Sequence, residues 1–130
     1  MELSPFRKLI VWQKAMELVR TVYRASKNFP SDERYALTDQ LRRAVVSIPS
    51  NIAEGMGRMS IKERIHFLEI SYASIMEVTC QLDISYSLGY ISETELVNAE
   101  SLAATLTKVM SGLRKSLENK NKYGNQEVPE

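Results

Sequence analysis

The fold is decided by residues 60–89, whose sequence is SIKERIHFLEISYASIMEVTCQLDISYSLG. The stretch opens with a capping box, Ser60-Ile61-Lys62-Glu63, in which the serine oxygen and the glutamate carboxylate can each accept from a backbone amide at the start of a helix. Gly89 can adopt the left-handed conformation that ends a helix. The pattern therefore predicts a helix over residues 61–88, about 40 Å long. Its main apolar row consists of Ile61, Ile65, Leu68, Tyr72, Ile75, Thr79, Leu82 and Tyr86.

A second apolar row lies beside the first, so the apolar surface of this helix is wider than one seam of a bundle requires. The second row consists of Ile70, Ala73, Cys80, Ile84 and Leu88. Glu77 interrupts the row, and a lone buried carboxylate is costly unless it is paired. We therefore expect Glu77 to meet an arginine or a hydroxyl group, within the protomer or across a subunit interface.

Three further helices flank this one. A second capping box, Ser92-Glu93-Thr94-Glu95, predicts a helix over residues 93–119, within which Gly112 is expected to mark the close approach of a neighbour. A polar tail, residues 121–130, is predicted to be disordered. The core row of the 93–119 helix consists of Leu96, Ala99, Ala103, Leu106, Met110, Leu113 and Leu117.

The first half of the chain predicts two more helices, over residues 9–27 and 32–54. Pro30 pushes the residue before it out of the helical region, so the first helix ends there. Ser31 is expected to cap the second, whose buried row is Leu37, Leu41, Ala44, Ile48 and Ile52. No segment alternates as a half-buried strand does. With short connections, the sequence predicts one all-α domain over residues 1–120, an antiparallel up-down-up-down bundle of four long helices.

Composition narrows the class of protein. Apolar residues make up 44% of the 130 and charged residues 25%, which is typical of a globular domain. No apolar run reaches the ~18 residues of a membrane span, and the N-terminus lacks the apolar region of an export signal. The single cysteine, Cys80, excludes an internal disulfide framework and a cysteine-rich zinc site. These features predict a cytoplasmic protein with no membrane partner.

Charge is unevenly distributed along the chain. The net charge is +1. Residues 1–30 hold six basic and two acidic groups, whereas residues 31–55, 56–90 and 91–130 each have an excess of one acidic group. Overall basicity therefore gives no reason to expect nucleic-acid binding, which must depend on where the arginines lie.

An irregular segment follows residue 40. Pro49 removes a backbone donor and crowds the Val45 carbonyl, at a cost of ~3 kcal/mol in a regular helix. We expect a kink rather than a break, because the apolar row continues in phase through Ile52. Asn51 is expected to tie down the backbone that the proline frees. Gly55 and Gly57 then allow a tight turn.

Basic residues in this region are the candidate ligand-binding groups. A cluster at the end of the bundle could contact phosphate, aided by the amides that begin the next helix. Alternatively, its members pair with Glu54, Glu69 or Glu77, and we expect Arg43 to be a buried or interfacial partner of a carboxylate. The predicted binding residues are Arg42, Arg58, Lys62 and Arg64. The predicted structural polar network is Arg43, Asn51, Glu54 and Glu77.

The sequence predicts no catalytic, cofactor or metal site. Glu63 and His66 superficially match the E-x-x-H motif of di-iron bundles, but that site needs the motif on two helices and His66 is the only histidine. No glycine-rich phosphate-binding loop occurs. The chain is therefore not expected to be an enzyme.

Several motifs together resemble a known bacterial family. They are Trp12-Gln13-x-Ala15, Phe29-Pro30, Gln40-Leu41-Arg42-Arg43-Ala44, SIPSNIAEGxGR at 47–58 and Glu77-x-x-x-Gln81-Leu82. Over residues 6–118 the chain resembles the four-helix-bundle family named for proteins encoded within intervening sequences of 23S ribosomal RNA genes. The resemblance implies an antiparallel four-helix protomer and a ring-shaped homopentamer. More distantly, the chain is similar to accessory proteins of diversity-generating retroelements, bundles that bind nucleic acid and a reverse transcriptase.

These observations favour a non-enzymatic oligomeric scaffold that binds RNA, DNA or a protein that handles nucleic acid. The alternative is a protein-interaction module without nucleic-acid binding, whose partner docks on the ring or on the basic first helix. A metal-dependent or small-molecule enzyme is the third hypothesis.

Overall fold

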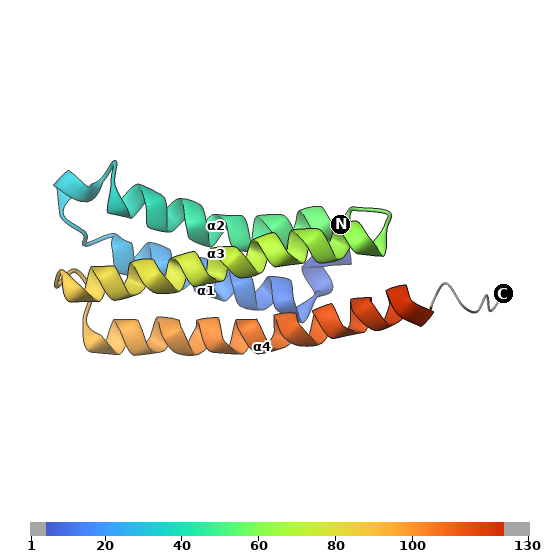
Figure 1. Cartoon of the computed structure of the whole chain (residues 1–130). Coiled ribbons are helices and arrows are strands. Elements are labelled where there is room, and N and C mark those ends of the chain that lie inside the picture. The colour runs from blue at the N-terminus through green and yellow to red at the C-terminus, as the bar shows by residue number, and fades with distance from the viewer. Residues whose placement is uncertain (1–4, 124–130) are drawn as a thin grey trace.

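The computed structural model describes residues 5–123, which form four long α-helices and no strand. The helices are α1 (Ile10–Ser26), α2 (Leu37–Met56), α3 (Ile61–Ser87) and α4 (Glu93–Tyr123), with short 3-10 helices η1 (Pro5–Lys8) and η2 (Ser31–Glu33) before α1 and α2. The chain reverses direction at each connection between long helices, so helices that follow one another lie side by side (Figure 1). The prediction of an all-α fold with four long helices is confirmed.

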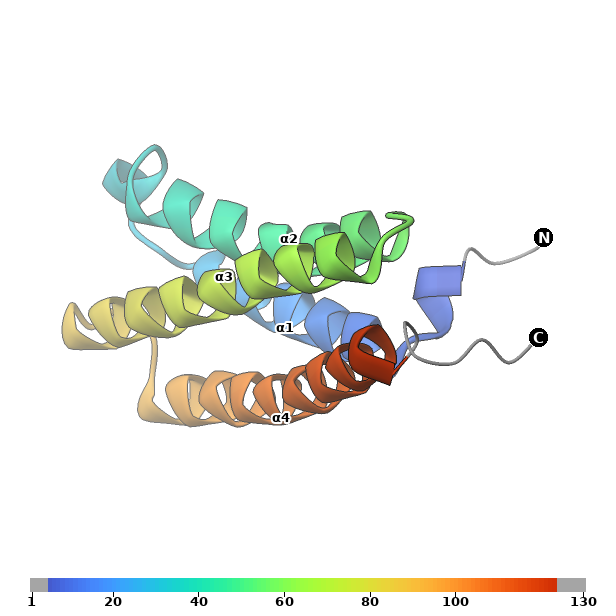
Figure 2. The same cartoon turned by 45° about the vertical axis from the view of Figure 1, so that its right-hand side comes forward.

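The core lies between four helices arranged in a square. α2 and α4 each pack against both α1 and α3, an arrangement that the rotated view also shows (Figure 2). The buried apolar side chains come from one face of α1, from most of the predicted rows of α2 and α4, and from part of the main row of α3. The most deeply buried large ones are Leu18, Val22, Leu41, Val45, Ile48, Ile52, Ile75, Val78, Leu82, Leu106 and Met110.

Local signals set both ends of α3 and the start of α4. Ser60 Oγ accepts from the amide of Glu63 at 3.1 Å, and Ser92 forms the complete capping box, with bonds of 3.1 and 2.9 Å to and from Glu95. Gly89 has a φ of +80° directly after the end of α3, as predicted. These motifs satisfy backbone groups that a helix end leaves unpaired.

Two predicted boundaries are wrong. α2 begins at Leu37 rather than after Ser31, and a Glu33 carboxylate oxygen accepts from the Leu37 amide at 3.3 Å. Tyr90, which follows α3, contacts Phe29 and Glu33 in the α1–α2 connection. The connection is therefore fastened at the end of α3, and α2 starts only after it. α4 continues to Tyr123, so residues 121–123 of the predicted tail are helical; residues 124–130 lie outside the described residues.

α2 and α3 approach each other closely around the irregular segment. α2 is unbroken through Pro49, as predicted. Asn51 Nδ2 donates to the Ser47 carbonyl at 2.8 Å, rather than to the Val45 carbonyl that the proline deprives of a donor. Gly55 lies within α2, where an added Cβ would be 2.9 Å from Phe67 Cβ. Gly55 therefore allows close helix packing rather than the tight turn predicted for it.

Gly112 has the opposite surroundings. An added Cβ there would meet no atom within 4 Å, so the predicted close neighbour is absent within residues 5–123.

Candidate interaction surfaces

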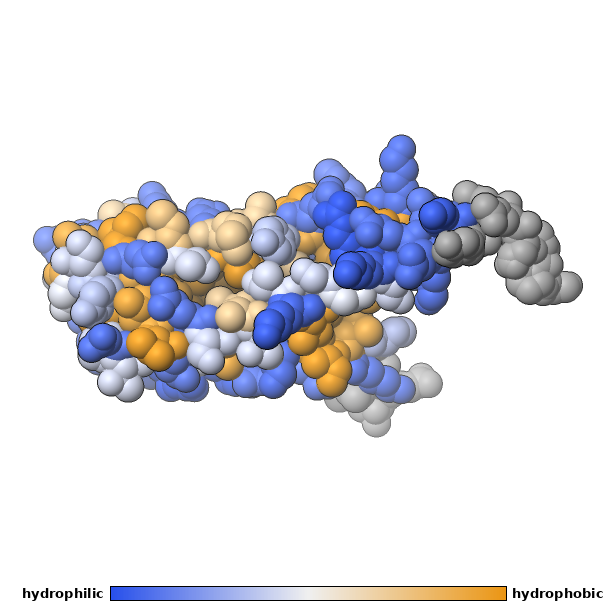
Figure 3. Space-filling view, turned by 60° about the horizontal axis from the view of Figure 1, so that its bottom comes forward, coloured by the Kyte–Doolittle hydropathy of each residue, from blue (hydrophilic) through white to orange (hydrophobic). Residues whose placement is uncertain are grey.

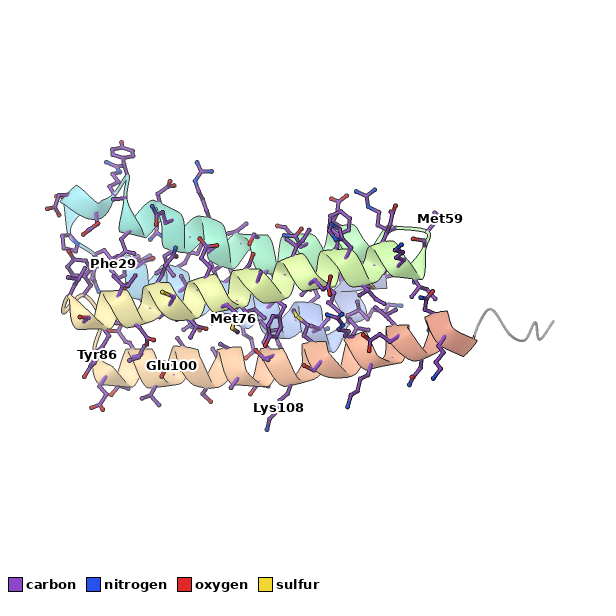
Figure 4. All side chains as sticks on the ribbon, in the orientation of Figure 1. Phe29, Met59, Met76, Tyr86, Glu100 and Lys108 are labelled. Atoms are coloured by element: carbon purple, nitrogen blue, oxygen red, sulfur yellow. The ribbon has the colours of Figure 1, made fainter. Side chains whose placement is uncertain are left out.

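The predicted basic cluster is divided between the two ends of the bundle. Arg42 lies in the second turn of α2 and Arg58 follows the end of that helix. At 1.5 Å per residue, sixteen residues separate them by about 24 Å along the axis. Phe29, in the α1–α2 connection, and Met59, in the α2–α3 turn, lie at opposite ends of the molecule (Figure 4). Arg42 therefore cannot share a ligand site with the turn.

The arginines of the α2–α3 turn are engaged in local contacts. Arg58 pairs with Glu54 at 2.8 Å, lies 3.8 Å from Glu63, and stacks over the Phe67 ring at 4.6 Å. Arg64 Nε donates to the Arg58 carbonyl at 2.9 Å. These contacts shape the turn and largely neutralise it.

Lys62 differs from those arginines. Its side chain is exposed and has no ion-pair partner among residues 5–123. Of the predicted binding residues in this turn, Lys62 is the one left available to a phosphate.

The four residues of the predicted polar network do not form one network. Each contacts a group one turn away on its own helix. The contacts are Arg43–Asp39 at 3.0 Å, Asn51–Ser47 at 2.8 Å, Glu54–Arg58 at 2.8 Å and Glu77–Gln81 at 3.2 Å. The Arg43 side chain is 78% exposed and Glu77 is also exposed, so neither is buried within the protomer, and a contact of either across a subunit interface stays a prediction.

The outward face of α3 is the largest departure from an ordinary amphipathic helix. Its exposed row Ile70, Ala73, Glu77, Cys80 and Ile84 has spacings of three, four, three and four residues, the spacing used in helix–helix seams. Ile70, Met76, Ile84 and Leu88 are between 37% and 53% exposed. We call Ile70, Ala73, Glu77, Cys80, Ile84 and Leu88 the α3 outer row. It contains the second row of the sequence analysis, and it faces away from the core.

The physical reason lies on the opposite face of α3. Ser71 and Ser85 are fully buried there, and Ser71 Oγ donates to the Ile48 carbonyl at 2.9 Å. Ser47 and Ser74 hydroxyls meet at 2.6 Å across the same contact. Small hydroxyl side chains let the two helices lie close together, and in this orientation Ile70, Ile84 and Leu88 lie outside the core while Ile75 and Leu82 lie inside it.

A second apolar surface runs between α1 and α2. This α1–α2 groove is lined by Trp12, Met16, Val19, Val46, Pro49, Ser50 and Ala53. It continues past Val46 into a polar section lined by Tyr23, Asp39, Arg42 and Arg43. The two sections adjoin at Val46, which lines both.

The end of the bundle at the α1–α2 connection combines arginines with tyrosines. Arg42 Nε donates to Ser26 Oγ at 2.8 Å, and its guanidinium lies 4.7 Å from the centre of the Tyr23 ring. Arg34 lies 5.6 Å from the centre of the Tyr35 ring, and Tyr35 is 86% exposed. Arg42 therefore joins α1 to α2, whereas Tyr35 stands in solvent.

Tyr90 fastens this connection to the end of α3. Its ring packs against Phe29 with centroids 5.3 Å apart, and its hydroxyl donates to Glu33 at 2.8 Å. The hydrogen bond to Glu33, followed by burial and the negative charges of Glu33 and Asp32, raises the pKa of the Tyr90 phenol.

The α4 side of the molecule is mixed. In Figure 3 apolar patches on this side are separated by hydrophilic side chains. Arg114 bridges α3 and α4 by pairing with Glu69 at 2.8 Å and with Glu118 at 3.0 Å. Hydrogen bonds to these two carboxylates raise the pKa of Arg114.

Two findings concern other classes of site. Within residues 5–123, no three His, Cys, Asp or Glu side chains are grouped so that they could hold a metal ion. None of the described helices is both long and apolar enough to cross a membrane.

The comparison with known proteins agrees with this architecture. Residues 7–112, which are 106 of the 130, match the family described as 23S rRNA-intervening sequence protein. The chain belongs to this family. No curated protein matches it. In this family member, the SIPSNIAEG segment supplies Ser47, the Ile48 carbonyl and Gly55 to the contact between α2 and α3. The same segment also supplies Pro49, Ser50 and Ala53 to the α1–α2 groove, so it takes part in a packing contact and in a surface depression.

Sequence reasoning missed Tyr35 and Arg34 as site candidates. A lone tyrosine beside an arginine carries no periodic signal, and its exposure follows from the late start of α2. The excess of basic residues in 1–30 was the available signal that this half of the molecule is positively charged.

Proposed function

We propose that this protein is a non-enzymatic subunit of a homo-oligomeric scaffold, in which the α3 outer row is covered by a second copy of the chain. The exposed seam-like spacing of that row carries the proposal. Apolar area gains about 25 cal/mol per Å² when it leaves water, so a row of this length favours association. A cytoplasmic setting suits the row, because Cys80 stays a thiol there.

The surface that accepts the row is the α1–α2 groove of the neighbouring copy. The row from Ile70 to Ile84 and the groove side of α2 from Asp39 to Ala53 each span fourteen residue steps, or about 21 Å. Exposed Glu77 on the row complements exposed Arg43 at the rim of the groove. Two different surfaces that mate head to tail generate a ring if the rotation closes.

The family resemblance implies that five copies close the ring. Five chains of 14.8 kDa give about 74 kDa. Such a ring leaves both ends of every bundle accessible to a partner, which is RNA, DNA or a protein that handles nucleic acid.

The assembly is tested by light scattering on the full chain after size-exclusion chromatography. We expect about 74 kDa for the wild type and 14.8 kDa for Ile84→Lys, since the lysine places a charge in the seam. Val97→Lys is the control, because Val97 is an exposed apolar residue on α4 (56%) outside the row. Circular dichroism checks that both variants remain helical. A monomeric wild type, or equal dissociation by both variants, would contradict the proposal.

A further inference from the structure

We infer that the end of the bundle around the α1–α2 connection binds single-stranded nucleic acid, with basic side chains on the phosphates and Tyr35 stacked on a base. The inference deepens the proposed function, since it names the partner of the scaffold and the surface that the partner occupies. It differs from the sequence prediction, which placed phosphate contacts in the turn at the opposite end.

Charge is the first observation. Residues 20–43 carry three more basic than acidic groups, while the whole chain has a net charge of +1, so the remainder has −2. The basic groups are Arg20, Arg24, Lys27, Arg34, Arg42 and Arg43, and the acidic ones are Asp32, Glu33 and Asp39. This end is therefore the positive part of a nearly neutral molecule. A phosphate backbone is attracted to such a patch and releases counterions when it binds.

The acidic groups at this end are largely engaged, whereas several basic ones are available. Asp39 pairs with Arg43, and Glu33 accepts from both Tyr90 and the Leu37 amide. Within residues 5–123, Arg20 and Lys27 are exposed and have no ion-pair partner. Two cations on one helix face are thus open to solvent.

The aromatic side chains are the second observation. Tyr35 is 86% exposed, and its ring is flanked by the Arg34 guanidinium at 5.6 Å. Tyr23 and Arg42 line the groove that the proposed interface covers, so the stacking face offered to a strand is that of Tyr35. A basic surface with an exposed aromatic ring is the means by which proteins bind single strands, because every base offers a face for stacking.

The aromatic ring of Tyr35 also distinguishes one class of polyanion from another. In a duplex the base faces are stacked on one another, so an exposed tyrosine cannot reach them without unstacking the helix. An acidic peptide would use the charges but would gain nothing from the ring. The combination therefore favours a single strand.

Binding is measured by fluorescence anisotropy with labelled twelve-nucleotide oligo(U) and oligo(dT), titrated with the full chain at 50 and 200 mM salt. We expect Tyr35→Ala to weaken binding about five-fold or more, and Tyr35→Phe, which keeps the stacking face, to match the wild type. Tyr35 packs against no core residue, so the fold should tolerate both changes. The oligonucleotide that binds with the higher affinity identifies RNA or DNA as the ligand.

The charge contribution has its own matched variants. Arg20→Ala with Lys27→Ala should reduce the slope of log affinity against log salt by about 1.4, since two phosphate contacts to a single strand are lost. Arg58→Ala with Lys62→Ala removes two cations from the opposite end and should leave the slope unchanged. If both double variants reduced the slope equally, the binding site would not lie at the α1–α2 end.

Three further results would overturn the inference. They are no binding by the wild type at 50 mM salt, unchanged binding by Tyr35→Ala, and competition by poly-glutamate as strong as that by unlabelled oligonucleotide. The last result would assign the surface to an acidic protein. The same titration with Ile84→Lys distinguishes a failure of the nucleic-acid inference from a failure of the proposed scaffold. A monomeric wild type would contradict the scaffold, but the affinities of Tyr35→Ala and the wild type could still be compared.

Discussion

At the scale of single residues, Tyr90 shows how one side chain positions a connection that has no regular structure. Its hydroxyl donates to Glu33, and the other carboxylate oxygen of Glu33 accepts from the first amide of α2. The start of α2 is thus linked to the end of α3 through two hydrogen bonds on one carboxylate. The exposed Tyr35 lies between Glu33 and Leu37 in the sequence, so its position depends on the same two hydrogen bonds.

The Tyr90 link should make stability depend on alkaline pH. The phenol has a raised pKa in the folded state, so its protonated form is favoured there. This contribution is complete below the unfolded pKa of about 10 and is lost as the pH rises through the folded value. We expect Tyr90→Phe to lower the free energy of unfolding at pH 8, and the difference from the wild type to narrow above pH 10. Urea denaturation at several pH values measures it, and a gap that stays constant with pH would contradict the assignment.

At the scale of elements, the contact between α2 and α3 explains why α3 exposes its second apolar row. The buried hydroxyl of Ser71 bonds to the carbonyl of Ile48, just before Pro49. Where the helices come closest, Gly55 replaces any side chain. The orientation of α3 is therefore set by small residues at the contact with α2 together with the buried Ile75, Val78 and Leu82.

Two glycines within helices should respond oppositely to alanine. Gly55→Ala places a Cβ 2.9 Å from Phe67 Cβ and 3.3 Å from the Arg64 carbonyl, so α2 and α3 must separate. We expect a loss of about 1–3 kcal/mol in the free energy of unfolding. Gly112→Ala fills open space and should stabilise α4 by roughly 0.5–1 kcal/mol. Chemical denaturation of both variants measures this, and the assignment of Gly55 to close packing fails if both changes stabilise.

At the scale of the whole molecule, the α3 outer row and the α1–α2 groove lie on different sides of one square bundle. Surfaces placed in this way cannot meet within a protomer, but they can meet between copies. Glu77 and Arg43 then contribute opposite charges to the proposed interface, and each is exposed in the protomer.

A charge exchange tests whether Glu77 and Arg43 meet between copies. Glu77→Arg and Arg43→Glu should each raise the concentration at which the assembly dissociates about five-fold or more, because like charges then face each other. The double variant should restore association. Lys108→Glu is the control, since Lys108 projects away from the bundle on α4 (Figure 4). Light scattering across a dilution series measures dissociation, and a double variant as weak as its parents would place the two residues apart.

The sequence by itself determined the helices, because the signals that make them are local. Both capping serines, Gly89 and the apolar rows of α2 and α4 act within one or two turns of the chain, and the structure agrees with the caps, with Gly89 and with most of both rows. The family could be recognised for a related reason, since its strongest motif is a continuous segment of α2.

Only the tertiary structure decided which face of α3 is buried and which basic residues share a surface. Periodicity places residues on a common face but does not say what lies opposite that face. Ser71 and Ser85 gave no apolar signal, yet they are buried beside Ile75 and Leu82 of the main row, and the Ser71 hydroxyl bonds to α2. Arg42 and Arg58 looked like one cluster, but the unbroken helix α2 holds them at opposite ends. Such relations depend on contacts between distant segments, which only the packed molecule contains.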